Sequence, residues 1–86
     1  MIATLEWLCD CHCAALVRVY EGGAPLDGPY VWCVTVAMVA GLPVLKGCDK
    51  KPVPGVVRPM RQALREAGFT KYRRIHNGRW RDVDLC

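Results

Sequence analysis

Apolar and polar positions alternate through the N-terminal segment of the chain, residues 3–20. Every odd position from Leu5 to Val19 is apolar, which is the period of a strand with one buried face. A helical stripe also fits part of this segment, through Leu5, Leu8, Cys9, Cys13, Leu16 and Val17. Because the segment is too long for one ordinary strand, we predict a strand over about residues 14–20, preceded by another strand or a short helix.

The middle of the chain predicts two more strands. Residues 21–29 are rich in glycine and proline, which indicates a loop. Residues 30–39 are apolar at nearly every position and rich in valine, which favours a central strand buried on both faces. After a turn at Ala40 and Gly41, residues 42–46 predict a shorter strand. Pro43 has no N–H for a sheet ladder, so it restricts this strand to an edge or lies among its first residues.

A helix is predicted over residues 57–67. Pro59 suits the first turn of a helix, where its missing N–H would have no partner, and Gly68 supplies the stop. One side of the helix is apolar and another is basic, so we expect the apolar side to pack on the sheet. The apolar side has Met60, Ala63, Leu64 and Ala67, and the basic side has Arg58, Arg61 and Arg65.

Residues 70–85 predict a β-hairpin whose register follows from its turn. Asn77-Gly78 is a strong signal for a two-residue turn, because both positions need a positive φ. Pairing outward from this turn sets opposite charges together on one face, which supports the register. That face pairs Ile75 with Trp80, Arg73 with Asp82 and Lys71 with Asp84. The other face pairs Arg74 with Arg81, Tyr72 with Val83 and Thr70 with Leu85.

These elements predict one small α+β domain. The chain has 86 residues, which is the length of a single domain. We expect an antiparallel sheet of five or six strands, with the helix over residues 57–67 on one face and the hairpin over residues 70–85 at its end. A chain of this size buries only about 60–65% of its unfolded surface, and 52% of its residues are hydrophobic. We therefore predict a homodimer, with the strand over residues 42–46 as a possible edge.

Charge divides the chain into two parts. Of its 12 basic residues, only Arg18 precedes Lys46, where it stands against four acids. From Lys46 onward, eleven basic residues stand against four acids. This balance predicts an anionic partner for the C-terminal part, either a nucleic acid or an acidic protein. The residues assigned to partner binding are Arg61, Arg74, His76, Arg79 and Arg81.

The tip of the predicted hairpin sets Arg74 directly against Arg81. Like charges at opposite positions destabilise a sheet. Either both guanidinium groups turn apart into water, or Asp10 or Glu21 of the same chain lies between them, or an external anion does: a phosphate, a nucleic-acid backbone or an acidic protein. The first interpretation is the commoner one, because exposed arginines are common.

Six cysteines are present in this short chain, and three of them alternate at Cys9, Cys11 and Cys13. Because the neighbouring apolar residues alternate in the same phase, we expect these three to face the core as reduced, buried thiols without a metal. The alternative is a metal site at Cys9-Asp10-Cys11-His12-Cys13. Zinc sites more often use Cys-x2–4-Cys loops with turn residues, which this run lacks.

Catalytic residues cannot be assigned from the sequence, and whether the protein is an enzyme stays open. Serine is absent, which excludes a serine nucleophile. The basic loop over residues 46–55 precedes the predicted helix, and helix starts bind anions. It lacks the Walker pattern, so a solvated basic loop is the simpler interpretation.

The order of elements around Arg65-Glu66-Ala67-Gly68-Phe69 resembles that of the GNAT N-acetyltransferases, in which a helix often ends in Gly-Phe before a closing hairpin. Small phage-encoded proteins carry similar segments. The resemblance covers about half of the chain and implies either a GNAT-like accessory protein without a cofactor or an acetyl-CoA-dependent acetyltransferase. In the second case Lys50, Lys51 and Gly55 would bind the cofactor phosphates. That loop has one glycine and two prolines where the family pattern has donors of N–H groups.

We expect neither a signal peptide nor a membrane-spanning segment. The N-terminus has no basic region, and the longest apolar run is about residues 30–40, shorter than a spanning helix needs. We therefore expect a cytoplasmic protein that does not associate with a membrane.

Overall fold

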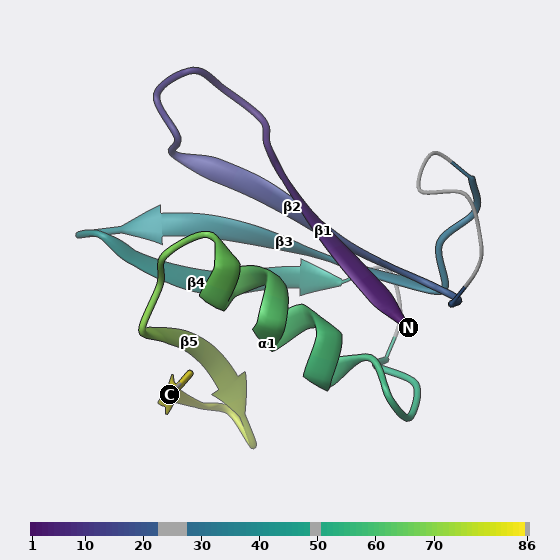
Figure 1. Ribbon diagram of the computed structural model, residues 1–86. Helices are drawn as coiled ribbons and strands as arrows, with labels where there is room; N and C mark the ends of the chain where they lie inside the picture. Colours follow the sequence, from purple (N-terminus) through teal and green to yellow (C-terminus); the bar gives the residue numbers. More distant parts are fainter. Residues whose placement is uncertain (23–27, 49–50, 86) are drawn as a thin grey trace.

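The computed structural model describes residues 1–22, 28–48 and 51–85 (Figure 1). Among these residues, six strands form one sheet and a single helix covers one of its faces. The elements are β1 (Ile2–Trp7), β2 (Ala14–Tyr20), β3 (Trp32–Val39), β4 (Leu42–Cys48), α1 (Val57–Glu66), β5 (Lys71–His76) and β6 (Arg79–Asp84). The first part of the ambiguous N-terminal segment is therefore a strand, the rest of it up to Cys13 is a loop, and β2 has the predicted bounds.

The sheet is mixed, so the prediction of an antiparallel sheet was wrong in one place. The strands lie in the order β1-β2-β3-β4-β5-β6, and neighbours are antiparallel except for β4 and β5. These two run parallel and pair only at Val44 and Arg73. The reason is the helix between them: a strand–helix–strand crossover returns the chain to the end where β4 began.

The expected edge position of residues 42–46 was also wrong. Strand β4 lies between β3 and β5, and the free edges of the sheet are β1 and β6. The alternative placement of Pro43 is correct, since it is the second residue of β4 and lies opposite Met38 of β3.

The core lies between α1 and the face of the sheet that it covers. The odd residues of β2 point into it, as their alternation predicted, and Val34 and Val36 of β3 join them. The helix contributes Met60, Ala63 and Leu64, and the chain on either side of it supplies Val56, Tyr72 and Leu85.

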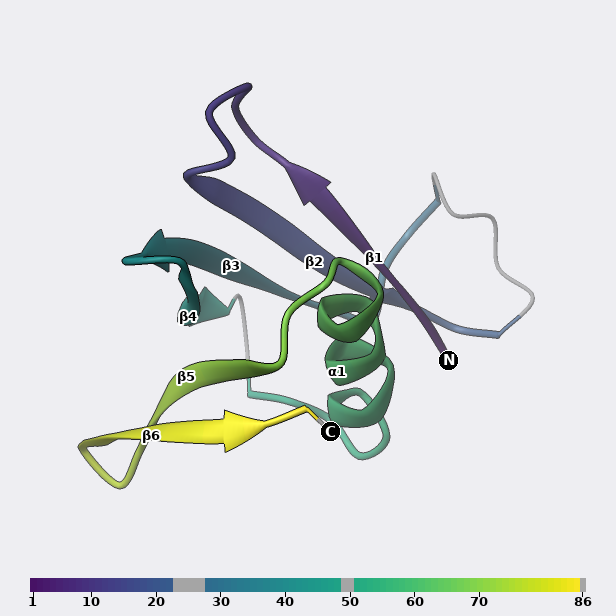
Figure 2. The ribbon, with the colours of Figure 1, turned by 60° about the vertical axis from the view of Figure 1, so that its left-hand side comes forward.

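Strand β3 is buried on one face only, which corrects the prediction of burial on both faces. Trp32, Val34 and Val36 are buried, whereas the residues between them are half-buried at Cys33 and exposed at Thr35. Since the single described helix lies on one side of the sheet (Figure 2), the opposite side of β3 has no second layer to cover it among the described residues.

The helix ends as its sequence predicted. Gly68 has a φ of +98°, and its N–H donates to the carbonyl of Arg65 at 3.0 Å. The N–H of Phe69 donates to the carbonyl of Leu64 at 3.1 Å. These two bonds form the glycine-dependent C-terminal motif that satisfies the last carbonyls of a helix.

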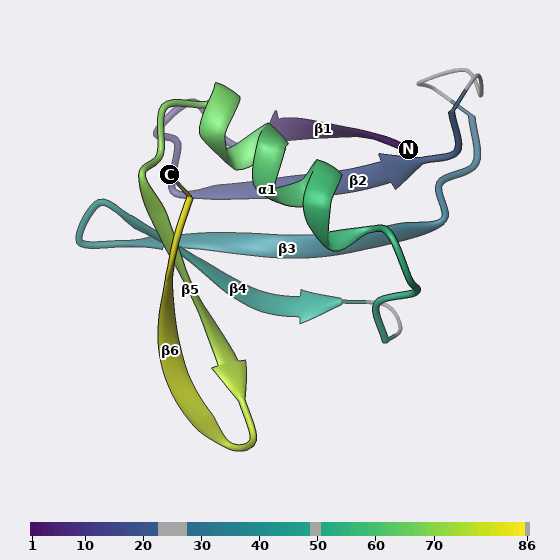
Figure 3. The ribbon, with the colours of Figure 1, turned by 60° about the horizontal axis from the view of Figure 1, so that its bottom comes forward.

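The C-terminal hairpin has the predicted register throughout β5 and β6. Asn77 and Gly78 both have positive φ, and His76 pairs with Arg79. Its base is buried through Tyr72 and Leu85, as expected. From this base the hairpin turns away from β4, so that the two parallel strands diverge (Figure 3).

No helix among the described residues is long and apolar enough to cross a membrane. The only described helix, α1, has ten residues.

Candidate functional site

A groove opens where β4 and the hairpin diverge, and we call it the basic groove. It has a volume of about 580 Å³, with Lys46, Arg61 and Arg74 supplying its charge. Its apolar lining comes from β3, α1 and β5, and includes Trp32, Met60 and Tyr72. The groove therefore combines three cations with an apolar floor.

Arg61 also lines a second hollow, of about 500 Å³, together with Arg58 and Arg65. Its Nη2 donates to the carbonyl oxygen of Asp84 at 2.7 Å. The Nε of the same guanidinium is buried and has no hydrogen-bond partner among the described residues. A buried donor without an acceptor is unfavourable, so this Nε lowers the stability of the packing around Arg61.

Arg65 has a structural role beside Arg61. Its Nε donates to the carbonyl of Leu85 at 2.5 Å. Together the two arginines bind the last residue of β6, Asp84, and the next residue, Leu85, to α1, so they hold the hairpin against the helix. The sequence places Arg58, Arg61 and Arg65 on a common side of the helix, and the structure confirms that they share a hollow.

The hairpin places Arg74 opposite Arg81, and both side chains are exposed. Arg79, next to the turn, is exposed as well. Arg74 lines the basic groove, whereas Arg79 and Arg81 are not among its lining residues. The backbone of His76 pairs with that of Arg79; the His76 side chain lies outside the described part of the structure.

On the other face of the hairpin, Arg73 and Asp82 form the predicted ion pair. The Nε of Arg73 lies 2.7 Å from the Oδ1 of Asp82. The hydrogen bond from Arg73 holds the pKa of the Asp82 carboxyl below its usual range. The same face exposes half of the Trp80 side chain, and the Nζ of Lys46 lies 5.3 Å from the centre of its ring.

The predicted cofactor residues are only partly placed. Lys50 lies outside the described residues, and Lys51 is exposed. Gly55 has a φ of +92° and lines the hollow that holds Arg58, Arg61 and Arg65. Lys46 was not singled out as a site residue, because nothing local marks it: its importance comes from the divergence of β4 from the hairpin.

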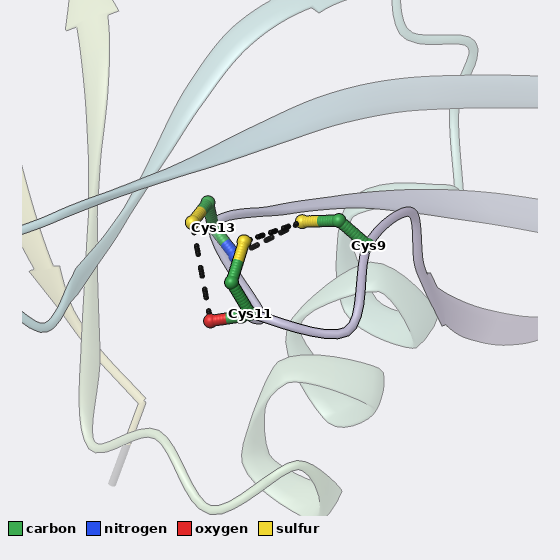
Figure 4. Close-up of side chains that lie close together, drawn as sticks. All are labelled: Cys9, Cys11 and Cys13. Atoms are coloured by element: carbon green, nitrogen blue, oxygen red, sulfur yellow. Dashed lines mark hydrogen bonds between the residues drawn. The ribbon is translucent and has the colours of Figure 1, made fainter.

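The three alternating cysteines lie in the loop between β1 and β2, which corrects the prediction that they face the core (Figure 4). Cys9 is half-buried, and Cys11 and Cys13 are exposed. The apolar alternation continues through residues 8–13, but the strand does not, because the chain reverses there. His12 adopts a φ of +55° and its N–H donates to the carbonyl of Cys9 at 3.1 Å.

The three sulfur atoms gather on one side of this loop, all within 4.8 Å of one another. The Sγ atoms of Cys9 and Cys11 are 3.0 Å apart, and the N–H of Cys13 donates to the Sγ of Cys9 at 3.4 Å. Hydrogen bonds from Cys11 and from the N–H groups of Cys13 and Ala14 lower the pKa of the Cys9 thiol to about 7. The neighbouring Cys11 sulfur, and then burial, raise the pKa of Cys13 to about 11.

A scan against protein-family models, a search of curated proteins and a search of solved structures each found no match to this chain.

Proposed function

We propose that the protein binds an anionic macromolecule, specifically single-stranded nucleic acid, on the surface formed by α1 and the hairpin. The observation that carries this proposal is the basic groove, whose lining combines Lys46, Arg61 and Arg74 with an apolar floor. Phosphate oxygens can accept charge-assisted hydrogen bonds from such side chains.

The charge around Arg61 supports the same ligand. Lys46 and Arg74 line the basic groove with it, and Arg81 stands opposite Arg74. Two guanidinium groups held at opposite register positions repel each other, and a phosphate between them would remove that repulsion. A backbone with regularly spaced phosphates can reach both this pair and Arg61.

Trp80 favours a single strand over a duplex. Half of its side chain is exposed, on the opposite face of the hairpin from Arg74. Since β6 is a free edge of the sheet, a flexible strand can pass around it and stack a base on the face of the indole opposite Lys46. Aromatic stacking beside cations is the usual way in which proteins hold single strands.

The test is fluorescence anisotropy with labelled single-stranded DNA and RNA at several salt concentrations. Replacing both Arg74 and Arg81 with alanine should weaken binding. It should also reduce the slope of log K against log salt by about 0.7 for each phosphate that the variant no longer neutralises. Trp80→Ala should weaken binding with little change in the slope, because it removes stacking and no charge.

Arg18→Ala is the matched control for the single change Arg74→Ala, since each removes one positive charge and Arg18 pairs with Glu6, away from the groove. It should bind almost as the native protein does. Absence of binding by the native protein at low salt would end the nucleic-acid proposal. Binding of an acidic polypeptide but of neither nucleic acid would replace it with an acidic protein partner.

A second candidate function is acetyl-CoA-dependent N-acetyl transfer on a GNAT-like scaffold of the small phage-encoded type. The observation in its favour is that β4 and β5 are parallel and diverge after one bridge, with the basic groove between their carboxyl ends. Ligands of parallel sheets bind in such crevices. Under this candidate Lys51 and Gly55, with Lys50, would bind the cofactor phosphates.

A thermal-shift titration with acetyl-CoA separates the two candidates. A ligand that binds only the folded state raises the melting temperature as its concentration increases. At a ligand concentration of a hundred times the dissociation constant, the folded state gains about 2.7 kcal/mol of stability. Under the second candidate, acetyl-CoA should raise the melting temperature well beyond the effect of pyrophosphate at equal concentration. Under the first candidate the two compounds should have similar effects, because the basic groove would bind the phosphate groups of either one.

We also propose that two copies associate in the cytoplasm. The sequence suggested an edge strand at residues 42–46 as the interface, and the structure moves this strand to the interior of the sheet. What supports association instead is the sheet face that α1 leaves uncovered, where Leu16, Cys33 and Ala37 are only half-buried.

A further inference from the structure

The cysteine loop, residues 8–13, holds a second cluster of reactive side chains that the basic groove does not use. It lies at the turn between β1 and β2, and presents the sulfurs of Cys9, Cys11 and Cys13 together (Figure 4). Cys11 and Cys13 are exposed and Cys9 is only half-buried, so packing in the core does not explain three thiols in one short loop. We propose that this loop is a three-thiolate site for a soft metal ion, Zn²⁺ or Cu⁺.

The distances suit a single ion. All three sulfur atoms lie within 4.8 Å of one another. With metal–sulfur bonds of about 2.3 Å, two thiolates on one tetrahedral ion lie about 3.8 Å apart. The Sγ atoms of Cys9 and Cys11 are now 3.0 Å apart, so binding requires them to separate slightly, which a side-chain rotation at the exposed Cys11 allows.

The backbone holds this loop in the form that the site needs. The N–H of Leu8 donates to the carbonyl of Ala14 at 2.9 Å, and the N–H of Met38 on β3 donates to the carbonyl of Cys13 at 2.8 Å. The imidazole ring of His12 stacks on Trp7, with ring centres 4.4 Å apart. The cysteines therefore project from a loop that is fixed to the sheet at both ends and in its middle.

One backbone bond is suited to a metal thiolate in particular. The N–H of Cys13 points at the Sγ of Cys9, and such a bond stabilises a sulfur that carries negative charge. Three thiolates this close repel one another, and a bound cation removes that repulsion. This explains why the thiols are gathered and exposed instead of dispersed in the core.

The chemistry of the donors selects the ion. Thiolates prefer Cu⁺ and Zn²⁺ over Mg²⁺ or Ca²⁺, which take oxygen ligands. Each thiol that is still protonated gives its proton to solvent as its sulfur bonds the metal, so up to three protons leave for each ion bound. The described cluster supplies three protein ligands. Zn²⁺ would therefore keep one position for water or another ligand, and Cu⁺ would be three-coordinate.

The experiment titrates the reduced protein, without oxygen, with Zn²⁺ and separately with Cu⁺. Mass spectrometry under native conditions should show one ion for each chain, and Cd²⁺ used as an optical stand-in for Zn²⁺ should produce thiolate-to-metal absorption in the ultraviolet. The preference between the two ions follows from competition with a chelator of known affinity for each.

Single replacements Cys9→Ser, Cys11→Ser and Cys13→Ser should each weaken binding by about tenfold or more, since replacing a residue that merely hydrogen-bonds to a metal ligand already costs about 10–100-fold. Cys33→Ser is the matched control: this thiol is half-buried on β3, outside the cluster, and its replacement should leave stoichiometry unchanged. Circular dichroism of each variant establishes that the fold is retained.

Three results would overturn the proposal. The first is the absence of stoichiometric binding of either ion by the reduced protein. The second is unchanged binding by the triple serine variant, which would place the metal elsewhere. The third is a Cys9–Cys11 disulfide, seen by mass as the loss of two hydrogens, in a protein that binds no metal after reduction.

Discussion

Leu64 lies fully buried in the layer between α1 and the sheet. Leu64→Ala should lower the free energy of unfolding by about 2–5 kcal/mol, because it leaves a cavity in a core that has few other residues to close it. Val57→Ala on the same helix is the matched control, since Val57 is 45% exposed. Its effect should stay within about 0.5 kcal/mol. Urea denaturation measures both, and similar losses for the two variants would contradict this account of the core.

The lowered pKa of Asp82 leads to a prediction of how the stability of the protein depends on pH. The hydrogen bond of this residue with Arg73 lowers the pKa of the folded-state carboxyl below the usual value of 3.8. The pair with Arg73 therefore stabilises the folded protein at pH values above the usual pKa of the carboxyl. This stabilisation is lost as the pH falls through the lower pKa that Asp82 has in the folded state. Asp82→Asn should have a slightly lower melting temperature than the native protein at pH 7, and this difference should vanish at acidic pH.

High salt provides the control for this prediction. The pair is exposed, so salt screens it, and the difference in melting temperature at pH 7 should shrink in concentrated salt. A difference that persists unchanged at low pH would show that Asp82 stabilises the hairpin through something other than its charge.

At the scale of elements, the strands and turns that could be predicted are those specified by neighbouring residues in the sequence. The Asn77-Gly78 turn fixes its own geometry, so the pairing of β5 with β6 follows without knowledge of the rest of the fold. The prediction for the three cysteines of the loop was wrong for a related reason. Alternation of apolar and polar residues shows which positions share a face of a strand, but it does not show whether the strand continues. Strand β1 already ends at Trp7, and the chain reverses over residues 8–13, where His12 has a positive φ although it is not a residue type that predicts a turn as glycine is.

The end of helix α1 is expected to depend on Gly68. Gly68→Ala should destabilise the protein by about 1–2 kcal/mol, because a Cβ is strained at a φ of +98°. Gly47→Ala in β4 is the matched control: an added Cβ there has the same open space and no positive φ. Thermal unfolding of the two variants checks this, and equal melting temperatures would show that the helix end does not depend on the glycine.

At the scale of the whole molecule, long-range contacts set the features that the sequence did not predict. The parallel neighbours β4 and β5 meet at a single bridge, Val44 with Arg73, between segments that are remote along the chain. The basic groove exists because these strands diverge, so its lining by Lys46 and Arg74 was not visible from spacing. The charge of the C-terminal part was visible, which is why Arg61 and Arg74 could be selected as candidates while their common groove could not be foreseen.

The uncovered face of the sheet gives the last prediction. Because α1 covers one side alone, the other side leaves Leu16 and its neighbours half-buried, and a second copy could cover them. Sedimentation at high micromolar concentration should give the mass of a homodimer. Leu16→Glu should give a monomer, because it would bury a charge at the interface. Val57→Glu is the matched control, since Val57 is exposed on α1, on the opposite side of the sheet from Leu16; it should leave the dimer intact. A monomer mass for the native protein would contradict the prediction, and equal dissociation by both variants would place the interface elsewhere.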